Sequence, residues 1–539
     1  MSAWHALASS ALRALARRQL ALPAPQSEVV SAREWVALAD GTRLETLVVR
    51  PREAARGSLL VRSAASLEPR QPLSLLAGPL AEQGLAVAIQ ECRGLRDSEG
   101  KFAPFAHEAS DGADAIHWLT AQPWFAAPLQ LAGFGYGGYA AFAALARSPA
   151  PIERLFVGHA SRDPYAWLHA GGALQLEAAF SLAFALAGAE QSHGEALSLE
   201  RALRHRPLRE ADRVGMRRLD WLREWLAHPA RDAFWEAKVA PLPARPPHAL
   251  LLAEWNHPAL AAQLADYAAL AAASEQAGAG GAALEIGAAG SASRRQSLRR
   301  IGEALRTAIR FLLPDADVRR APVRVFDGGA QRWREGAPWP PAGTVVRRLH
   351  LRGDGRAQGV DGDGRLESEA PGAFEPSDRF AYDPADATPS DDSRAERGDV
   401  LCFETPPLAA ALALAGAVHA ELYVASDAPV TDFCARLVAV DAEGRETALC
   451  EGIARGDAQA VEAGAWRVVV ACGSACWRIA AGGRLRLEIA SASHPRFDRG
   501  PNTSAAPADA GADGNALARQ TLFHDAAHAS CLEFEASEA

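Results

Sequence analysis

The sequence predicts an α/β domain with a mostly parallel sheet, a helical insertion in that domain, and a C-terminal all-β domain. Between residues 35 and 146, short apolar runs alternate with segments of helical spacing, as expected for parallel strands covered by helices. Residues 163–239 are rich in Ala, Leu and Arg and lack strand signals, which predicts the helical insertion. After residue 321, short apolar runs separated by Gly, Pro and Asp are typical of a β-sandwich.

The individual elements can be placed from the same patterns. Two strands are expected around a turn at Asp40-Gly41, within residues 35–50. Further strands of the α/β domain are predicted at 58–62, 85–90, 129–132, 154–157, 248–253 and 284–287, with helices at 111–119 and 139–146. In the C-terminal domain, strands are predicted at 344–351, 419–424, 435–440, 466–470 and 484–490, with a long acidic surface loop at 353–393.

These changes of pattern set the predicted domain boundaries. A chain of 539 residues is too long for one hydrophobic core, so several domains are expected. The boundaries are 1–30 for an amphipathic N-terminal helix or extension, 31–162 and 246–318 for the α/β core, 163–245 for the helical cap, and 319–539 for the all-β domain.

Composition and charge exclude several classes of function. A net charge of −9 without a basic stripe argues against a nucleic acid partner. No run reaches the roughly 18 apolar residues that a membrane span needs. The seven cysteines show no paired spacing, which predicts reduced thiols in a cytoplasmic protein. Cys472 and Cys476 have no further ligands at zinc-binding spacing, so no metal site is expected there.

A glycine-rich turn, Gly133-Phe134-Gly135-Tyr136-Gly137-Gly138, lies between a predicted strand and a predicted helix. As G-x-G-x-x-G it would indicate dinucleotide binding, but it follows several strands, and no acidic residue ends the next strand to hold a ribose. As a nucleophile elbow, it has small residues on both sides of the nucleophile position. That position is Gly135, which has no side chain to attack with. We favour the elbow and expect no cofactor.

This turn and several other segments resemble the cocaine esterase and X-Pro dipeptidyl-peptidase hydrolases. Residues 133–138 match the family's G-x-S-Y-x-G except at the serine, and 91–100 resemble its D-x-R-G-x-G-x-S-x-G. The resemblance implies an α/β-hydrolase fold with a helical cap and a C-terminal jelly roll, and serine hydrolase chemistry on esters or X-Pro peptides. Further similar segments are 111–124, 322–326, 427–433, 495–503 and 520–525.

The resemblance also locates the family's catalytic positions, and this sequence departs from the family at each of them. Gly135 replaces the nucleophilic serine. The family's acid, in G-W-x-D, corresponds to His257 in Glu254-Trp255-Asn256-His257. The family's histidine corresponds to Ser291, within a residue or two, and its oxyanion tyrosine to Ala65. The backbone N–H of Tyr136 is the one oxyanion donor that is retained.

Because triad members act as a unit, these replacements predict a pseudoenzyme, or a scaffold repurposed for a small acylated molecule in a cap-side pocket. Two alternatives stay open. A dyad of Ser291 and His257 could make the protein an active esterase, amidase or X-Pro dipeptidyl-peptidase. The chain could also be a structural subunit, in a homo-oligomer or with an active paralogue. His159, Asp163 and His169 could face the pocket, although capping or surface contacts explain them equally well.

Overall fold

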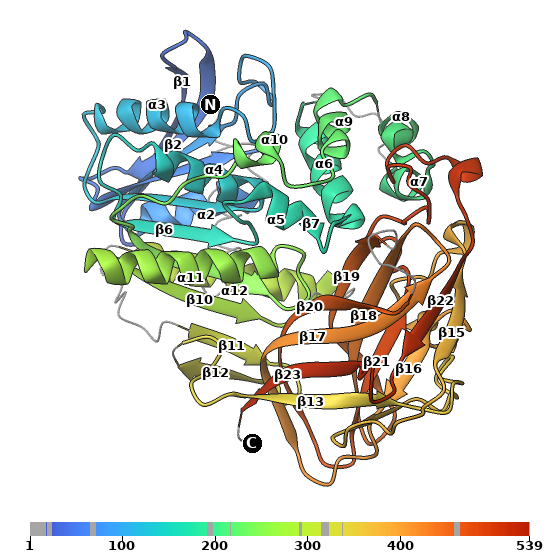
Figure 1. Ribbon diagram of the computed structural model, residues 1–539. Coiled ribbons are helices and arrows are strands. Elements are labelled where there is room, and N and C mark those ends of the chain that lie inside the picture. The colour runs from blue at the N-terminus through green and yellow to red at the C-terminus, as the bar shows by residue number, and fades with distance from the viewer. Residues whose placement is uncertain are drawn as a thin grey trace. The chain divides into compact units, whose positions relative to one another are not determined.

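The computed structural model describes residues 18, 24–64, 72–190, 198–215, 217–289, 294–313, 323–336, 338–457 and 464–537 (Figure 1). Two candidate residues, Ala65 and Ser291, lie outside the described residues, as does most of the predicted N-terminal helix.

The chain forms two compact units. The first contains residues 1–164, 185–195 and 233–322, and the second contains 165–184, 196–232 and 323–539. The finer boundaries between core, cap and all-β domain stay a prediction.

The first unit is built on a sheet in which eight strands follow the order β1-β2-β4-β3-β5-β6-β9-β10. The β1–β2 and β2–β4 pairs are antiparallel, and the other neighbours are parallel. Every residue of β3, β4 and β6 is buried, as expected for parallel strands covered on both faces. The strands are β1 Val29–Ala37, β2 Arg43–Pro51, β3 Gly57–Ser63, β4 Leu85–Glu91, β5 Leu129–Phe134, β6 Arg154–Gly158, β9 His248–Glu254 and β10 Gly281–Gly287.

Helices cover both faces of this sheet (Figure 1). Helices α2 and α12 pack on the face that bears Leu59 and Phe156. Helix α4 packs on the opposite face, because Gly138 lies against Val157, the neighbour of Phe156 on β6. Helix α3 packs on α4 through Gly112. The helices of this unit are α2 Pro72–Glu82, α3 Glu108–Thr120, α4 Tyr136–Ala146, α10 Ala233–Glu236, α11 Leu260–Ala277 and α12 Arg294–Leu312.

The insertion between β6 and β9 consists mainly of short helices, as predicted, with one correction. The sequence predicts no strand there, yet β7 (His169–Ala170) and β8 (Ala173–Leu174) form a small antiparallel hairpin. Strands of two residues are too short to leave a period-two pattern in the sequence. The helices are α5 Pro164–Leu168, α6 Leu176–Glu190, α7 Leu199–Arg204, η1 Leu208–Glu210, α8 Ala211–Gly215 and α9 Asp220–Ala227.

The C-terminal part of the second unit is all-β, as predicted. Ten strands follow the order β15-β22-β17-β23-β13-β14-β16-β21-β18-β19, and β20 pairs with β17. Phe403, Leu422, Leu437 and Leu487 are fully buried in its core. The strands of the C-terminal part are β11 Val323–Asp327, β12 Arg332–Gly336, β13 Val345–Arg352, β14 Arg365–Glu367, β15 Asp378–Tyr382, β16 Leu401–Glu404, β17 Leu412–Ser426, β18 Val430–Val440, β19 Glu446–Asp457, β20 Trp466–Ile479, β21 Arg484–Ala490, β22 Ala518–Phe523 and β23 Cys531–Ser537.

The acidic segment 353–393 is more regular than the predicted surface loop. It contains β14, β15 and the short 3-10 helix η2 (Pro384–Asp386), and a second such helix, η3 (Asp392–Glu396), begins within it. The acidic composition of this segment suggests an exposed loop, but one of the acidic residues in the segment is a buried hydrogen-bond acceptor. Asp378 is fully buried, 2.9 Å from Nε2 of the fully buried His524, and it accepts a hydrogen bond from the Ala357 N–H.

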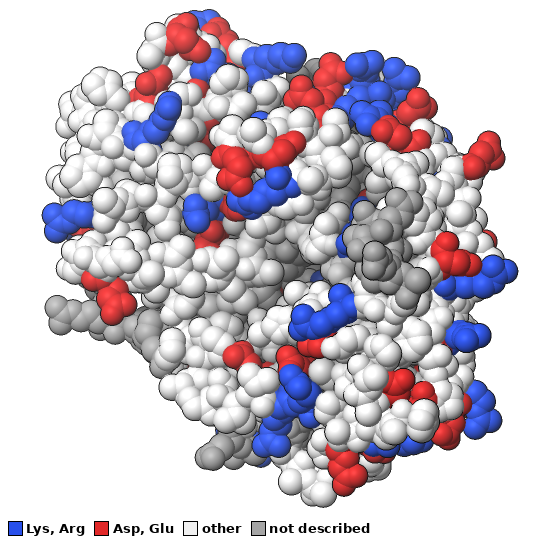
Figure 2. Space-filling view, in the orientation of Figure 1, with Lys and Arg blue, Asp and Glu red and all other residues white. Residues whose placement is uncertain are grey.

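The surface charges are mixed in sign, and the cysteines are buried. On the face shown in Figure 2, acidic and basic side chains are interspersed rather than gathered in one patch. The seven cysteines are free thiols, and all are buried. None of the described helices combines the length and apolar character that crossing a lipid bilayer requires.

The buried core of the all-β part predicts that replacing two different leucines by alanine will destabilise the protein to very different extents. We expect Leu487→Ala to lower the free energy of unfolding by about 2–5 kcal/mol, because it leaves a cavity in the core. Leu517 is 53% exposed, so Leu517→Ala is the matched control and should cost less than about 1 kcal/mol. Urea denaturation of both variants checks this, and equal losses would contradict the assigned core.

Candidate active site

The glycine-rich turn has the backbone of a nucleophile elbow. Gly135 follows β5, is the N-cap residue of α4, and has φ 52° and ψ −127°. Its N–H donates to the Gly158 carbonyl at the end of β6 (2.9 Å). A strained turn of this kind, between a strand and a helix, is what projects the nucleophile in α/β-hydrolases. The elbow conformation is therefore present at the predicted position.

The glycines on either side of Gly135 are required by close packing, whereas Gly135 itself is not crowded. A Cβ on Gly133 would lie 2.0 Å from the Gly137 carbonyl oxygen. A Cβ on Gly137 would lie 2.7 Å from the Arg62 carbonyl oxygen. A Cβ on Gly135 would meet no heavy atom within 4 Å. The space for a nucleophilic side chain therefore exists, and the glycine leaves it open.

Tyr136 anchors the elbow through its buried side chain. Its hydroxyl accepts the Phe105 N–H (2.9 Å) and donates to the buried carboxyl of Glu108. Burial, together with the nearby Glu108 carboxyl, raises the pKa of Tyr136 well above its ordinary value. Burial also raises the pKa of Glu108. The backbone N–H of Tyr136 lies in the first turn of α4, where a helix favours developing negative charge. Glu108 was missed by the sequence analysis because its partner is 28 residues away.

His159 lies at the carboxyl end of β6, beside the elbow. It directly follows β6, has a φ of 54°, and its ring stacks on Phe134 at a centroid distance of 6.4 Å. Its ring centroid is 4.9 Å from that of His257. Burial, with smaller contributions from His257 and Arg300, lowers the pKa of His159 to about 3. His159 is therefore a neutral imidazole at pH 7.

His257, the predicted replacement of the catalytic acid, lies in the loop between β9 and α11. Its Nδ1 accepts the Ala259 N–H (3.1 Å). In the neutral ring this acceptor role puts the proton on Nε2. Glu254, at the end of β9, is ion-paired with Arg300 of α12, with its Oε1 3.2 Å from Arg300 Nε and 3.9 Å from His159 Nε2. The sequence alone does not single out Glu254, because its partner Arg300 comes 46 residues later.

Among the other candidate residues, Asp163 is described by the structure, whereas Ser291 and Ala65 are not. The parallel register pairs Gly287 of β10 with Glu254 of β9, so β10, the strand that precedes Ser291 in the sequence, ends beside the end of β9. Ser291 and Ala65 themselves lie outside the described residues. Asp163 makes a local turn contact, since its N–H donates to the Ser161 hydroxyl (3.1 Å).

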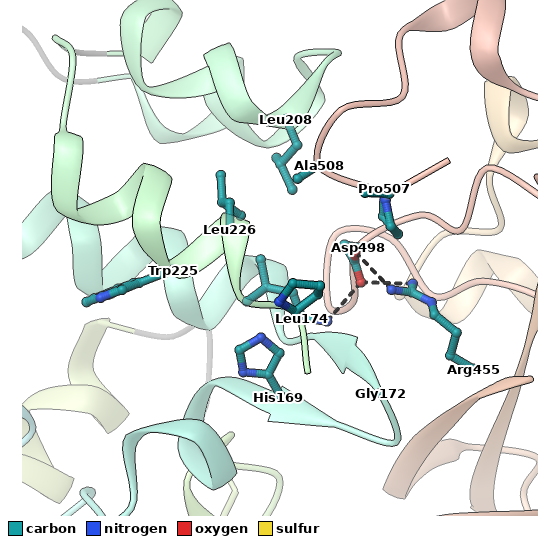
Figure 3. A pocket seen from close by; sticks show the side chains of 12 residues that line it. His169, Gly172, Leu174, Leu208, Trp225, Leu226, Arg455, Asp498, Pro507 and Ala508 are labelled. Carbon is teal, nitrogen blue, oxygen red and sulfur yellow. Dashed lines mark hydrogen bonds and ion pairs between the residues drawn. The ribbon is translucent and has the colours of Figure 1, made fainter. Parts of the chain in front are cut away.

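A pocket in the second unit contains His169, the remaining candidate. It lies between the β7–β8 hairpin, α9 and the loop that carries Asp498 (Figure 3). His169 is stacked on Tyr165 (centroids 4.3 Å apart), and burial lowers its pKa to about 4. The wall is otherwise largely apolar and includes Leu174, Leu208, Trp225, Leu226, Pro229, Ala506, Pro507 and Ala508.

The charged residues that line this pocket, Arg455 and Asp498, are ion-paired with each other. Arg455 Nε lies 2.8 Å from Asp432 Oδ1, and Arg455 Nη2 lies 3.1 Å from Asp498 Oδ1. Asp498 Oδ1 also accepts the Leu174 N–H (2.9 Å). With Arg455 paired twice and His169 neutral at pH 7, the pocket suits an uncharged, mainly apolar group with limited hydrogen bonding.

Known proteins match this chain along most of its length. The family of X-Pro dipeptidyl-peptidases (S15 family) matches residues 40–290, and the X-Pro dipeptidyl-peptidase C-terminal non-catalytic domain matches residues 316–533. Cocaine esterase from Rhodococcus sp. (strain MB1 Bresler) is 27% identical over 561 aligned positions, covering 92% of this chain and 94% of that protein.

Solved structures share the fold. An α-amino acid ester hydrolase has a TM-score of 0.77 at 17% identity, covering 96% of this chain and 98% of its own. An aminopeptidase from the marine sediment archaeon Thaumarchaeota archaeon has a TM-score of 0.76 at 18% identity, covering 95% and 97%. These likenesses and the elbow place the chain among the α/β-hydrolases that carry a C-terminal β-sandwich. Within that class, it belongs to the cocaine esterase and X-Pro dipeptidyl-peptidase family.

The low pKa of His159 predicts a loss of stability in acid. An unfolded histidine titrates near 6.5 and folded His159 near 3, so between these values the unfolded state binds more protons. The stability linked to neutral His159 is complete above pH 6.5 and falls as the pH drops toward 3. Between pH 7 and pH 5, this residue should account for a loss of roughly 2 kcal/mol.

The measurement is the free energy of unfolding at both pH values for wild type and His159→Gln. The variant should lose less stability on acidification than wild type does. His117 is exposed on α3, so His117→Gln is the matched control and should behave like wild type. An equal loss in wild type and His159→Gln would show that His159 titrates near its ordinary pKa.

Proposed function

We propose that this protein is a non-hydrolytic or very weakly hydrolytic member of its family that binds a small acylated molecule. The observation that carries the proposal is Gly135, which has the φ and ψ of a nucleophile elbow but no side chain. In the family's mechanism, the residue at this point attacks the acyl carbon. Without that attack no acyl-enzyme forms, so the elbow and the Tyr136 N–H retain only the capacity to bind an acyl group.

The proton-transfer groups support the same proposal. A serine nucleophile needs an imidazole nitrogen with a free lone pair, and a carboxylate that orients the ring. The Nδ1 of His257 is already an acceptor for the Ala259 N–H, so the neutral ring carries its proton on Nε2. The carboxylate of Glu254 is ion-paired with Arg300. Both groups are therefore engaged in contacts that hold the loop and α12.

The pocket of the second unit supports a binding role. Its apolar wall and neutral His169 suit an aliphatic or aromatic acyl group rather than an ionised one. A small acylated molecule is thus the class of ligand that we propose.

The first test restores a hydroxyl to the elbow. We expect wild type and Gly135→Ser to show no turnover of p-nitrophenyl esters or X-Pro anilides beyond about tenfold that of Gly135→Ala. The alanine variant is the matched control, because it carries the same strain at positive φ without a hydroxyl. The open space beside Gly135 lets both side chains fit. Substantial activity in Gly135→Ser would show that working triad partners are present. Substantial activity in wild type would refute the proposal directly.

The second test addresses the alternative of an active hydrolase that uses Ser291 with His257. That alternative has one structural observation in its favour: the strand that precedes Ser291 pairs with the strand that precedes His257. We expect a fluorophosphonate probe to leave wild type unlabelled. Labelling that disappears in Ser291→Ala and His257→Ala, but persists in the control Ser293→Ala, would establish the dyad and overturn the pseudoenzyme proposal.

A further inference from the structure

Two arginine side chains of the second unit lie close together, although both carry a positive charge. Arg206 lies between α7 and η1, and Arg499 lies in the loop between β21 and β22. Arg206 Nη2 donates to the Arg499 carbonyl (3.1 Å), and Arg499 Nη2 donates to the Arg204 carbonyl (3.4 Å). Each side chain therefore reaches the segment that carries the other, and the two guanidinium groups repel each other.

The acceptors of both guanidinium groups are main-chain carbonyls, which have no net charge. Besides the two bonds above, Arg206 Nη1 donates to the Pro507 carbonyl (3.2 Å), and Arg499 Nη1 donates to the Pro384 carbonyl (3.4 Å). In the part of the chain that the structure describes, neither arginine has a carboxylate within ion-pairing distance. The carbonyl contacts therefore orient the guanidinium groups but do not neutralise them.

Nearby carboxylates are engaged with other arginines. Asp498 Oδ1 lies 3.1 Å from Arg455 Nη2, and Asp509 Oδ2 lies 2.9 Å from Arg209 Nη2. The two arginines described above are only partly exposed, and a partly buried charge without a counter-charge is costly. Their positive charge therefore lacks an anionic partner among the described residues.

His494 lies beside the same arginines. Burial, followed by the charges of Arg499, Arg206 and Arg204, lowers the pKa of His494 to about 4. Burial, followed by repulsion from Arg499, also lowers the pKa of Arg206 to about 10. The Nδ1 of His494 is buried and has no hydrogen-bond partner among the residues that the structure describes. Two charged arginines and a neutral histidine with an unused ring nitrogen are suited to binding an anion.

We propose that Arg206 and Arg499 together bind a phosphate group. A guanidinium has five N–H donors, and the carbonyl contacts use two on each arginine, so three on each remain for an anion. The planar fork of arginine matches the oxygens of phosphate. A phosphate monoester carries about −1.5 to −2 charge at pH 7 and can balance both arginines, whereas a carboxylate balances only one. Neither arginine lines the apolar pocket that contains His169, so this inference does not depend on the proposed function.

The first experiment measures phosphate binding by the full chain. Titration calorimetry with sodium phosphate at pH 7, at an ionic strength held constant with NaCl, should show one binding event per chain. Arg206→Gln and Arg499→Gln should each weaken binding by about 10- to 100-fold, because each removes charged hydrogen bonds to the anion. Arg347 is exposed on β13, so Arg347→Gln is the matched control for the loss of one positive charge and should bind like wild type.

Two further titrants define the anion. Methyl phosphate represents a phosphate ester, and sodium acetate represents a carboxylate. Binding of methyl phosphate at least as tight as that of inorganic phosphate would identify the ligand as an ester, and weaker binding would identify it as free phosphate. Acetate should bind more weakly than inorganic phosphate, because one negative charge does not balance two arginines. Equal affinities for acetate and phosphate would overturn the assignment to phosphate.

A second experiment reads the wild-type chain, so it holds even if the glutamine variants do not fold. A bound phosphate places negative charge beside His494, so saturating sodium phosphate should raise the pKa of His494 above about 4. NMR of protein labelled in the histidine rings measures this, with His494→Gln assigning the resonance. The resonance of His117, which is exposed on α3, should not respond.

Three results would overturn the proposal. The first is the absence of binding heat in wild type at millimolar sodium phosphate. The second is an unchanged affinity for phosphate in folded Arg206→Gln and Arg499→Gln. The third is an unchanged pKa of His494 at a phosphate concentration that saturates the binding heat, because the anion would then bind elsewhere.

Discussion

The hydrogen bond from the Gly135 N–H to the Gly158 carbonyl joins the turn after β5 to the end of β6. This bond brings two strand ends so close together that no side chain fits at several neighbouring positions. A Cβ on Gly138 would lie 2.8 Å from that of Ala160, and one on Gly133 would enter the turn itself. The elbow therefore depends on backbone contacts and small residues. None of these contacts involves a side chain at residue 135.

Around this turn, the charged groups are engaged with one another. Arg62 is fully buried beneath the elbow, donates to the Glu108 carbonyl (2.9 Å), and lies 3.5 Å from Asp111. Asp111 is in turn ion-paired with Arg93 (2.7 Å). A carboxylate bound by arginine is already satisfied, so it holds neighbouring segments together rather than orienting an imidazole. This arrangement explains how a fold descended from hydrolases can keep its polar interior without the hydrolytic machinery that we propose it lacks.

Much of the fold could be predicted because its signals are local. Fully buried strands such as β4 and β6 appear in the sequence as continuous apolar runs, and closely spaced glycines indicate the elbow. The β7–β8 hairpin was missed because two residues cannot show a period. The order within residues 353–393 was missed because Asp378 is acidic in composition but is buried against His524.

The candidate site could be assigned from the sequence to loops after particular strands, but the contacts of its residues could not. The sequence locates Gly135, Tyr136 and His257 by their order after particular strands. It could not reveal that Glu254 pairs with Arg300, because that contact depends on how α12 returns to the sheet. Nor could it give the low pKa of His159, because the burial that causes it arises from segments distant in the chain.

The β7–β8 hairpin has a mechanical consequence for the second unit. Although it belongs to the insertion by sequence, the Arg455 N–H of β19 donates to the Gly171 carbonyl (2.8 Å). Leu174 exchanges two hydrogen bonds with Asp498, one in each direction. A segment held this way cannot open independently of the sandwich that holds it. Its amide protons should exchange with solvent at the slow rate of the β-sandwich, so any ligand that orders the hairpin would also make the C-terminal part unfold more cooperatively.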